Sequence, residues 1–491
     1  MNQGLFINGQ WTTGRSTGTR EIINPFNREV IATVVEATRK DTQDAIAAAR
    51  AAFDSGPWPR FAASERAALV RALGDAVEQH REELAHLESL DTGKTLEESR
   101  WDMDDIAGIF RYYADIVESD MADSAVQSPI KDSTSTIVRE PVGVCGQISP
   151  WNYPLLQASW KMAPALAAGC TIIMKPSEIT PLTTIRITEL AQEVGFPPGV
   201  VNLVLGAGHP VGAELAESLD VDLISFTGGI ETGRKIMQAA SGNAKKIALE
   251  LGGKNPHIVF ADADIETAVD YALNAVFFHA GQICSAGARL LLESSIHDDF
   301  VSALRAKMER IVIGNGMVDG TQMGPLISEQ HRDKVERAIK LGQEEGATVL
   351  TGGKRPDAKE LENGFFVTPT LFTNCTSEMR IVQEEVFGPV ITVERFETEE
   401  EAIILANDTT YGLSAGFWTT DTARQQRVSR ALRFGTVWIN DFNVYFVQAP
   451  WGGYKQSGIG RELGRAGLEE YLETKHVFQN LTPKSLNWFG G

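Results

Sequence analysis

Apolar residues recur at helical spacing along much of the first 120 residues. The stretches 41–52 and 64–90 are rich in alanine and place apolar side chains three or four positions apart between charged residues. Apolar positions with this spacing lie on one face of an α-helix. The pattern therefore predicts that residues 40–120 are mostly helical.

From about residue 142 the pattern changes to short runs of β-prone residues separated by helical stretches. Strands are predicted for VGVCGQI (142–148), TIIMK (171–175), VNLVL (201–205), DLISF (222–226) and KIALE (246–250). Alternation of strands and helices is typical of a mainly parallel sheet. This part of the chain is therefore predicted to be an α/β domain.

The alternation resumes between residues 289 and 440, which predicts a second α/β domain. Its predicted strands are RLLLE, TPTLFT, VITVERF, SAGFWT and GTVWIN, and helices are predicted for 399–407 and 422–433. No segment repeats along the chain, which excludes solenoid architectures. Two further stretches, 128–140 and 471–481, have an alternating polar pattern. We interpret them as strands that leave the body, with surface loops as the alternative.

Composition and charge favour a soluble protein with more than one domain. A chain of 491 residues is too long for a single core, and its 43% hydrophobic and 22% charged residues are ordinary. The net charge of −20 argues against binding to nucleic acid. The longest nearly apolar run, 162–174, is too short to span a bilayer. The start MNQGLFINGQW is unlike a signal peptide, and the cysteines are few, so we expect a cytoplasmic protein.

Cys284 is the candidate nucleophile. It lies in GQICSAG (281–287), where glycine and other small residues let backbone and substrate approach closely. The other cysteines, Cys145, Cys170 and Cys375, have apolar or β-prone neighbours. A reactive thiolate needs a partly open site with positive charge or hydrogen-bond donors. The alternative is a buried structural cysteine, but the possible partners elsewhere in the chain favour catalysis.

Polar side chains follow the first two predicted strands of the first domain. Asn152 lies in PWNYP (150–154), and Lys175 and Glu178 lie in KPSE (175–178). Ligands of open parallel sheets bind beyond the carboxyl ends of the strands. A carboxylate at this place can accept hydrogen bonds from ribose hydroxyls and repel a 2′-phosphate. We therefore expect NAD rather than NADP, with Lys175 as a further donor.

Glycines near two other strands are candidates for a phosphate site. Gly206, Gly208 and Gly212 miss the G-x-G-x-x-G spacing by one residue, so alone they are weak evidence. TGGIETG (227–233) follows a strand and opens a helix, whose N-terminus can hold a pyrophosphate. Arg234 and the next lysine stand where a P-loop has Lys-Ser/Thr, which argues against ATP. The alternative for these glycines is ordinary turn formation.

Glu250 ends the strand KIALE beside two glycines, a position from which a carboxylate can act as general base for water. The alternatives are a helix cap or a partner for a lysine. The loop EEVFGP (384–389) adds a carboxylate and an aromatic ring from the second domain.

Seven motifs in this order resemble those of the aldehyde dehydrogenase superfamily over almost the whole chain: PWNYP, MKPSE, FTGG-x-x-TG, LELGGKNP, GQIC, EEVFGPV and PWGGYKQSG. The resemblance implies an α/β fold with a Rossmann-like NAD-binding domain (1–127 and 141–252) and a catalytic α/β domain (253–457). It also implies a small oligomerisation element (128–140 and 458–491), and hence a homodimer or homotetramer.

The resemblance also implies roles for single residues. Cys284 would be the nucleophile, Asn152 and the Cys284 N–H the oxyanion hole, and Glu250 the base for hydrolysis of a thioester. Glu385 would hold the nicotinamide ribose and Phe387 would pack on the nicotinamide. The remaining implied cofactor residues include Lys175 and Glu178 at the adenosine ribose, with Ile148, Ser149, Pro150, Trp151, Pro176, Ser177, Gly208, Gly212, Phe226, Thr227, Gly228, Gly229, Thr232, Leu251 and Gly252.

Within the superfamily, NPFN, LLQASWK, QAPWGGYKQSG and the final NWF are most similar to bacterial betaine aldehyde dehydrogenases. Such an enzyme makes glycine betaine. The candidate substrate residues are aromatic: Tyr153, Trp160, Phe278, Tyr445 and Trp451. Aromatic rings attract a trimethylammonium group, which has no hydrogen to donate. The alternative is that the tryptophans only pack the wall between domains.

The chain departs from the family pattern at two places near the candidate substrate residues. Phe278 stands where some members of the family have tryptophan, and Asn443-Val444 replaces a His-Pro pair that close relatives carry. Two weaker expectations also rest on the resemblance. Lys161 and Glu462 match a proton-relay pair, for which a structural ion pair is the alternative, and Asp91 lies in a segment that matches a potassium site.

Other activities remain open at this stage. An aminoaldehyde or broad-specificity aldehyde dehydrogenase would use the same chemistry. A non-catalytic protein of this fold would be expected to lack one of Asn152, Glu250 and Cys284, and all three are present. A coenzyme A-acylating enzyme would not need the hydrolytic base. A semialdehyde enzyme would want an arginine in the pocket, and none is among the candidate residues.

Overall fold

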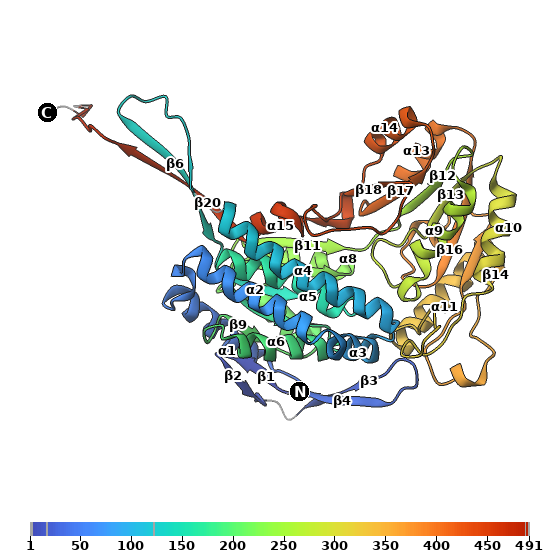
Figure 1. Ribbon diagram of the computed structural model, residues 1–491, viewed down its shortest axis with the longest axis horizontal. Coiled ribbons are helices and arrows are strands. Elements are labelled where there is room, and N and C mark those ends of the chain that lie inside the picture. The colour runs from blue at the N-terminus through green and yellow to red at the C-terminus, as the bar shows by residue number, and fades with distance from the viewer. Residues whose placement is uncertain (1–2, 16–17, 121–122, 487, 490–491) are drawn as a thin grey trace.

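Two α/β units and a projecting arm make up the molecule (Figure 1). The computed structural model describes residues 3–15, 18–120, 123–486 and 488–489. Among these residues, an eight-stranded and a seven-stranded sheet form the cores of the two units, and a three-stranded sheet forms the arm. The predicted α/β class is confirmed.

The first sheet has the strand order β19-β11-β10-β7-β8-β9-β1-β2. Its central strands are parallel, and antiparallel pairs add β19 at one edge and β1 and β2 at the other. The bounds are β1 (Leu5–Ile7), β2 (Gln10–Thr12), β7 (Val144–Ile148), β8 (Thr171–Lys175), β9 (Val201–Leu203), β10 (Leu223–Gly228), β11 (Lys246–Leu251) and β19 (Gly458–Ile459). Every residue of β7 and β8 is buried, as expected for parallel strands covered on both faces.

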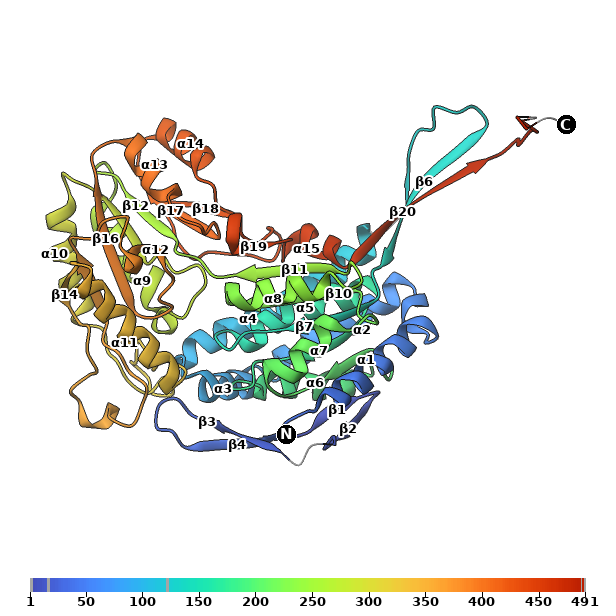
Figure 2. The same cartoon turned by 180° about the vertical axis from the view of Figure 1, so that it is seen from behind.

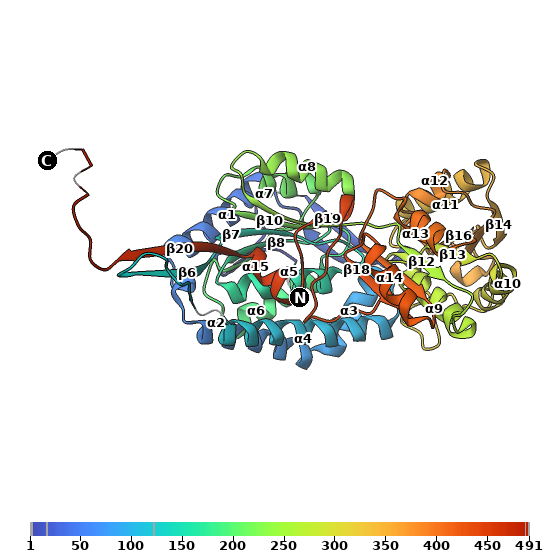
Figure 3. The same cartoon turned by 90° about the horizontal axis from the view of Figure 1, so that it is seen from above.

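Helices cover both faces of this sheet. Figure 3 shows α1, α7 and α8 on one side, and α5 and α6 on the other with α2 and α4 outside them. The bounds are α1 (Arg39–Asp54), α2 (Ala63–Gln79), α3 (Arg81–Thr92), α4 (Leu96–Asp120), α5 (Pro154–Ala168), α6 (Leu182–Val194), α7 (Ala213–Glu217), α8 (Ile230–Ala240) and α15 (Gly464–Glu470). The helical prediction for 40–120 is confirmed, although the stretch 64–90 divides into α2 and α3 at His80. None of the helices in the described ranges is long and apolar enough to cross a membrane.

The second sheet has the order β14-β15-β16-β13-β12-β17-β18. Its strands are β12 (Pro256–Val259), β13 (Arg289–Glu293), β14 (Thr348–Thr351), β15 (Thr370–Thr373), β16 (Val390–Phe396), β17 (Ser414–Trp418) and β18 (Thr436–Ile439). Its helices are α9 (Ile265–Phe277), α10 (His297–Met308), α11 (Glu329–Glu344), α12 (Arg380–Gln383), α13 (Glu399–Asn407) and α14 (Thr422–Ala431). All five predicted strands are present, and β12 and β14 are additional.

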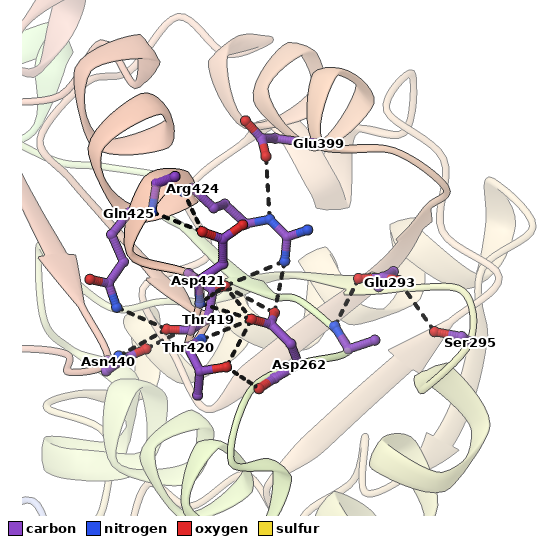
Figure 4. Close-up of polar contacts among 12 residues, drawn as sticks. Asp262, Glu293, Ser295, Glu399, Thr419, Thr420, Asp421, Arg424, Gln425 and Asn440 are labelled. Atoms are coloured by element: carbon purple, nitrogen blue, oxygen red, sulfur yellow. Dashed lines mark hydrogen bonds and ion pairs between the residues drawn. The ribbon is translucent and has the colours of Figure 1, made fainter.

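The Asp262 carboxylate, which follows β12, binds residues that follow β17 (Figure 4). Asp262 accepts hydrogen bonds from the hydroxyl groups of Thr419 and Thr420 and from the N–H groups of Thr420 and Asp421. The Arg424 guanidinium donates to the same carboxylate at 2.7 Å. Asp421 in turn caps α14 by accepting from the N–H groups of Ala423 and Arg424. This network fixes the first turn of α14 against the sheet.

The arm consists of β5 (Ser124–Ala125), β6 (Ser133–Pro141) and β20 (Leu472–Asn480). β20 pairs antiparallel with β6 along its whole length, and both extend away from the body in Figures 1 and 2. The strand prediction is thus confirmed for 133–140 and 472–480, whereas residues 128–132 lie in the loop before β6. Gly458 and Ile459, which the resemblance places in the oligomerisation element, form β19 beside β11. A hairpin of β3 (Thr19–Ile23) and β4 (Val30–Val35) flanks the first unit.

The two sheets face each other across a gap that the chain crosses between β11 and β12. β11 ends at Leu251 and β12 begins at Pro256, so the carboxyl edge of the first sheet lies opposite the amino edge of the second. Cys284 lies shortly before β13, at that amino edge. The domain boundaries themselves stay predictions.

Candidate active site

Three residues from separate elements line one cleft between the two units. The cleft has a volume of about 220 Å³, and Asn152, Glu250 and Cys284 all contribute to its wall. Asn152 precedes α5, Glu250 lies in β11 and Cys284 precedes β13. The structure thus brings together the three residues that the sequence singles out for nucleophilic chemistry.

The backbone before Cys284 is held in an unusual turn. His279 and Ala280 have φ values of 45° and 53°, a left-handed region that residues with a Cβ rarely adopt. Gly281 also has positive φ, and a Cβ there would lie 2.2 Å from the Gly388 carbonyl oxygen. The Asn255 amide donates to the Cys284 carbonyl at 2.8 Å and holds the far side of the segment. The glycine of the GQIC motif is therefore required by geometry.

Cys284 is half-buried and its thiol is held in the neutral form. Burial is the main cause of its raised pKa, and the nearby carboxylates of Glu250 and Glu385 act in the same direction. The N–H group of Ser285 opposes the shift. Positive charge entering the cleft would offset the two carboxylates and lower the pKa of the thiol.

The Asn152 side chain is buried and held in place by its own hydrogen bond. Its Nδ2 donates to the Gln282 carbonyl oxygen at 2.8 Å, which orients the amide toward the Cys284 segment. Gln282 is fixed in turn, because its Oε1 accepts from the Ile327 N–H at 2.9 Å and its Nε2 donates to the His279 carbonyl. The amide donor is thus preorganised rather than free to rotate.

Glu250 is a buried carboxylate with one oxygen, Oε1, that has no hydrogen-bond partner in the described chain. Burial and then the charge of Glu462 raise its pKa well above the ordinary value, while Lys161 and Arg461 act against this shift. Lys161 forms its ion pair with Glu462 and also donates to the Thr227 hydroxyl at 2.6 Å. The structure therefore contradicts the alternative that Glu250 is simply the partner of a lysine, because Lys161 pairs with Glu462 instead.

Three aromatic rings form a cluster beside the cleft. The ring centroids of Trp160 and Trp451 are 5.9 Å apart, and those of Trp160 and Tyr445 are 5.3 Å apart. Tyr445 donates its hydroxyl to Asp105 at 2.5 Å, and Trp438 packs behind Trp451 at 6.2 Å. Trp451 lines the cleft directly.

Tyr153 lines the same cleft, and a buried lysine lies over its ring. Lys94 Nζ is 4.0 Å from the centroid and forms an ion pair with Asp102 at 2.6 Å.

Phe278 is placed differently from the other candidate aromatic residues. It packs on Trp101 and lines a separate cavity, so its part in the substrate site stays a prediction.

A larger cleft of about 590 Å³ continues from the first along the carboxyl edge of the first sheet. The two share Pro150, Trp151, Thr227, Gly228 and Gly229, so they form one continuous groove. Thirteen of the residues expected at the cofactor line the larger cleft: Ile148, Ser149, Pro150, Trp151, Lys175, Ser177, Glu178, Gly208, Phe226, Thr227, Gly228, Gly229 and Thr232. Leu251, Gly252, Glu385 and Phe387 line the smaller one. Pro176 and Gly212 line neither, although Gly212 lies against Ile148 and Lys175.

The walls of the larger cleft fit a dinucleotide. Gly229 caps α8 without a side-chain hydrogen bond, and a Cβ at Gly229 would meet nothing within 4 Å, so the helix N-terminus is open to the groove. Lys175 and Glu178 form an ion pair at 3.2 Å. Burial opposes ionisation of Glu178, but the charge of Lys175, hydrogen bonds to the carboxylate and the charge of Arg20 together outweigh it and lower the pKa of the carboxyl. Glu178 is therefore an ionised acceptor.

Glu385 reaches the groove from the second unit. Its Oε1 accepts from the Gly253 N–H at 3.1 Å, and burial raises its pKa to about 7. Phe387 packs edge-on against Trp151, with ring centroids 5.3 Å apart. These contacts join the two units across the groove.

Helix α11 supplies residues that the sequence analysis missed. His331 and Lys334 line both clefts and Arg337 lines the larger one. Burial lowers the pKa of His331 to about 4, so it is neutral. The charged side chains of the larger cleft are then Lys175, Lys334 and Arg337 against the single carboxylate of Glu178. The basic residues of an amphipathic helix carry no signal of their own that would mark them as cofactor residues.

Asp91 is fully buried, and its Oδ2 accepts from the Leu182 N–H at 3.0 Å. Burial raises the pKa of Asp91 well above its ordinary value, although the hydrogen bond from Leu182 acts in the opposite direction. Within the described ranges, no group of three or more His, Cys, Asp and Glu side chains could hold a metal ion. The potassium site, which backbone carbonyl groups would form, stays a prediction.

Comparison with known proteins gives consistent results. The sequence profile of the Aldehyde dehydrogenase family matches residues 11–477. The chain is 64% identical over 489 residues to the betaine aldehyde dehydrogenase of Bacillus subtilis, which covers 100% of both chains. It is 45% identical to the peroxisomal aminoaldehyde dehydrogenase 2 of Pisum sativum, over 99% of this chain and 97% of the relative. The crystal structure of betaine aldehyde dehydrogenase from Staphylococcus aureus in complex with NAD+ superposes with a TM-score of 0.99 at 58% identity, covering 100% and 97% of the chains.

Proposed function

This chain belongs to the aldehyde dehydrogenase family, and we propose that it catalyses the NAD-dependent oxidation of betaine aldehyde to glycine betaine. One observation carries the proposal. Cys284, Asn152 and Glu250 line a single cleft that is continuous with a dinucleotide-shaped groove and has Trp451 of the aromatic cluster in its wall. The named relatives in bacteria and their NAD+ complexes support the same choice.

The residues of the larger cleft are suited to NAD. Glu178 and Lys175 would hold the adenosine ribose, the N-terminus of α8 would face the pyrophosphate, and Glu385 would hold the nicotinamide ribose. When bound, NAD accepts a hydride from the substrate carbon. The negative charge of the ionised Glu178 would repel a 2′-phosphate, so NADP would be the poorer cofactor.

After its thiol has lost its proton to water in the cleft, Cys284 attacks the aldehyde carbon as a thiolate, and the oxyanion of the resulting thiohemiacetal would accept hydrogen bonds from the Asn152 amide and the Cys284 N–H. A fixed donor at such a position is worth about 2.7–4 kcal/mol in transition-state stabilisation. Loss of hydride leaves a thioester on Cys284. Covalent catalysis of this kind divides one difficult step into two easier ones.

Glu250 takes a proton from water, which then attacks the thioester and releases the acid. Its raised pKa makes its ionised form a stronger base than an ordinary carboxylate. The Lys161–Glu462 pair lies next to Glu250 and could pass the proton onward.

The aromatic cluster supports a cationic substrate. Tyr153 and Trp451 line the smaller cleft, Trp160 packs against Trp451, and the described lining of this cleft contains no arginine. Ring faces attract a trimethylammonium group by about 0.5–2 kcal/mol each once water is excluded. Trp451 and Tyr153 would contact the charge, and Trp160 and Tyr445 would complete the cage.

The test is kcat/KM for betaine aldehyde against 3,3-dimethylbutanal, its neutral isostere, with NAD in excess. We expect the charged aldehyde to be preferred by roughly 10-fold or more, and Trp451→Ala to reduce that preference. Tyr153→Phe keeps the ring face and is the control. Equal losses for both aldehydes in the tryptophan variant would mean that the rings only pack.

Aminoaldehyde oxidation is a second candidate, favoured by one observation. Asp105 accepts a hydrogen bond from Tyr445, so a carboxylate lies directly behind the aromatic cluster, where it could attract a primary ammonium. The plant relatives named as aminoaldehyde dehydrogenases support this candidate. A higher kcat/KM for 4-aminobutanal than for betaine aldehyde would decide in its favour.

The remaining expectations are also proposals. A homodimer or homotetramer would form through the arm, the protein would work in the cytoplasm, and Asp91 would lie near a potassium ion bound by carbonyl groups. The exposed apolar side chains Val477 and Phe478 on β20 support the first of these.

A further inference from the structure

Phe387, whose ring is expected to pack on the nicotinamide, stands on strained backbone. Its φ is 60°, in the left-handed region that a bulky side chain rarely adopts. Such a conformation persists only where the surrounding structure holds the chain in place. The direction of the Phe387 ring therefore depends on the groups that hold the peptide units of the loop 384–389.

A histidine on helix α11 is one of these groups. His331 Nε2 lies 2.7 Å from the Phe387 carbonyl oxygen. A carbonyl oxygen can only accept, so Nε2 carries the hydrogen and the imidazole is fixed as this tautomer. Burial lowers the pKa of His331 to about 4, so the imidazole is neutral near pH 7. His331 thus donates a hydrogen bond to the strained backbone without bringing a charge into the groove.

The same imidazole packs against the ring of Phe387. Trp151, His331 and Phe387 all line the smaller cleft. The ring centroids of His331 are 5.0 Å from Trp151 and 6.0 Å from Phe387, and those of Trp151 and Phe387 are 5.3 Å apart. All three pairs meet edge to face. The phenyl ring cannot turn far without losing contact with both of its neighbours.

Helix α11 is itself fixed at this end. Ser328 caps the helix by accepting from the His331 N–H at 3.2 Å. One turn further along, the buried Val335 packs on the loop, because a Cβ at Gly388 would lie 2.7 Å from its Cγ2. Residues four positions apart lie on one face of a helix. One face of α11 therefore holds two successive residues of the loop, Phe387 by a hydrogen bond and Gly388 by packing.

The start of α11 is also tied to the segment of the nucleophile. The N–H of Ile327 donates to Gln282 Oε1 at 2.9 Å, and the Gly388 carbonyl lies against Gly281. Both contacted residues shortly precede Cys284. Hydride transfer needs its two reacting atoms about 3–3.5 Å apart and aligned. A single helix end that fixes both the thiol and the aromatic ring suits this requirement.

We propose that His331 is a positioning residue for hydride transfer, because its imidazole holds Phe387 in the left-handed conformation that aims the phenyl ring at the nicotinamide. The inference rests on the proposed places of NAD and Phe387 in the groove, and it holds for whichever aldehyde the enzyme prefers. Loss of the imidazole should slow formation of the thioester on Cys284, the step in which the hydride leaves. Hydrolysis of the thioester should be spared.

Three substitutions separate the hydrogen bond from the packing. His331→Phe keeps a ring beside Trp151 but has no donor. His331→Gln places an amide N–H near the position of Nε2 and should restore the bond to the carbonyl. The amide of His331→Asn ends nearer the helix backbone, at the position of Nδ1, and should not restore it.

Amide hydrogen exchange of the NAD-free protein is the first measurement. Residues 384–390 should exchange faster in His331→Phe and His331→Asn than in the wild type, because backbone that is no longer held opens more often. His331→Gln should exchange like the wild type. Helix α2, on the outside of the first unit, is the internal control and should not change. Equal exchange of the loop in all four proteins would overturn the proposal.

Rapid mixing with NAD and betaine aldehyde, unlabelled or deuterated at the aldehyde carbon, is the second measurement. The first turnover of NADH should slow by roughly 10-fold in His331→Phe, since misplaced reacting groups cost up to about 10²-fold in rate. Deuterium should slow it further, because hydride transfer then limits the turnover. His331→Gln should remain close to the wild type.

Hydrolysis of 4-nitrophenyl acetate is the matched control, because this ester acylates Cys284 without transfer of a hydride. Its rate should be the same in the wild type and in all three variants. Equal losses of both reactions in His331→Phe, or no recovery in His331→Gln, would contradict a role in positioning. A wild type that forms no NADH from any aldehyde would instead refute the proposed function, and hydrogen exchange would still decide whether His331 holds the loop.

Discussion

At the scale of single residues, the chemistry depends on how charges surround Glu250. Burial and the Glu462 carboxylate raise its pKa, whereas Lys161 lowers it. A general base works only when it has lost its proton, so activity limited by deacylation should fall as the pH drops through this raised pKa. The acidic limb of the pH profile is therefore expected well above the range of an ordinary glutamate.

Lys161→Met should move this limb to still higher pH, because it removes the cation that opposes the shift. The measurement is kcat against pH, with betaine aldehyde and NAD saturating. Lys161→Arg keeps the charge and should leave the limb near its wild-type place. If Lys161→Met lowers the melting temperature but leaves the limb where it is, the Lys161–Glu462 pair is structural and has no part in proton transfer.

Glu250→Gln should separate the two chemical steps. Acylation of Cys284 should continue, whereas hydrolysis should slow by about 10²- to 10⁴-fold, the usual contribution of a general base. Rapid mixing with excess aldehyde should give a burst of NADH near one equivalent per site and then a slow steady rate. Cys284→Ala is the control and should give neither phase. An unchanged steady rate in Glu250→Gln would assign the base elsewhere.

How much of the site the sequence could predict differs from residue to residue. Cys284, Asn152 and Glu250 lie in short motifs, and the structure brings them to one cleft. Other residues of the groove lie in helical or loop sequence without a distinctive motif. Gln157 and Arg337 line the groove, and Lys94 packs on the ring of Tyr153 in its wall. Their placement depends on which helix face meets the groove, and that is decided by packing between distant segments.

At the scale of elements, the first turn of α14 depends on Asp262. Its carboxylate accepts from Thr419, Thr420, Asp421 and Arg424, as Figure 4 shows. Burial opposes its ionisation, but these hydrogen bonds outweigh it and lower the pKa of the carboxyl. A lowered pKa in the folded state means stability that is present above the pKa of the unfolded chain, near 4, and lost as the pH falls through the folded value.

Asp262→Asn should therefore lower the free energy of unfolding by about 1–2 kcal/mol near pH 7, a partial loss because the side chain is one-third exposed. The difference from wild type should stay constant from pH 8 to pH 5 and shrink below about pH 4. Denaturant titrations at several pH values measure it. The same substitution at the exposed Asp319 is the control, and a difference that persists undiminished at low pH would contradict this account.

The strands show where sequence pattern is sufficient and where it is not. TIIMK, RLLLE and VITVERF match β8, β13 and β16 in every residue, because a parallel strand that is buried over most of its length contains an apolar run. β12, by contrast, is PHIV and begins with proline, which normally weakens a strand prediction. It lies inside the second sheet because it pairs with β13 and β17, a tertiary effect that its own residues do not indicate.

At the scale of the whole molecule, the arm exposes apolar side chains. Val477 and Phe478 are each 45% exposed on β20, and all of β20 beyond Leu472 is exposed. An unprotected strand with apolar residues favours association with another chain. Val477→Glu should therefore shift the protein to a smaller species in size-exclusion chromatography with light scattering. Gln479→Glu adds the same charge to the same face of the strand and should not do so. Identical molar masses for all three proteins would contradict a role of Val477 in assembly.

The distribution of charge over the whole molecule leads to the last prediction. The chain has a net charge of −20, yet the larger cleft is lined by Lys175, Lys334 and Arg337 against Glu178. A local excess of positive charge in an acidic protein suits a pyrophosphate, and α11 contributes it from the second unit.

Arg337→Gln should weaken NAD binding by roughly 5- to 30-fold, which corresponds to loss of about 1–2 kcal/mol from a partly screened charged hydrogen bond. Because salt screens this attraction, the wild type should lose more affinity than the variant as ionic strength rises. Titration of protein fluorescence with NAD at several salt concentrations measures both effects. Lys340→Gln removes an equal charge one turn further along α11, outside the cleft, and should have little effect. Equal salt dependence in the wild type and Arg337→Gln would show that the guanidinium does not meet the phosphates, and would leave Lys334 and the N-terminus of α8 to hold them.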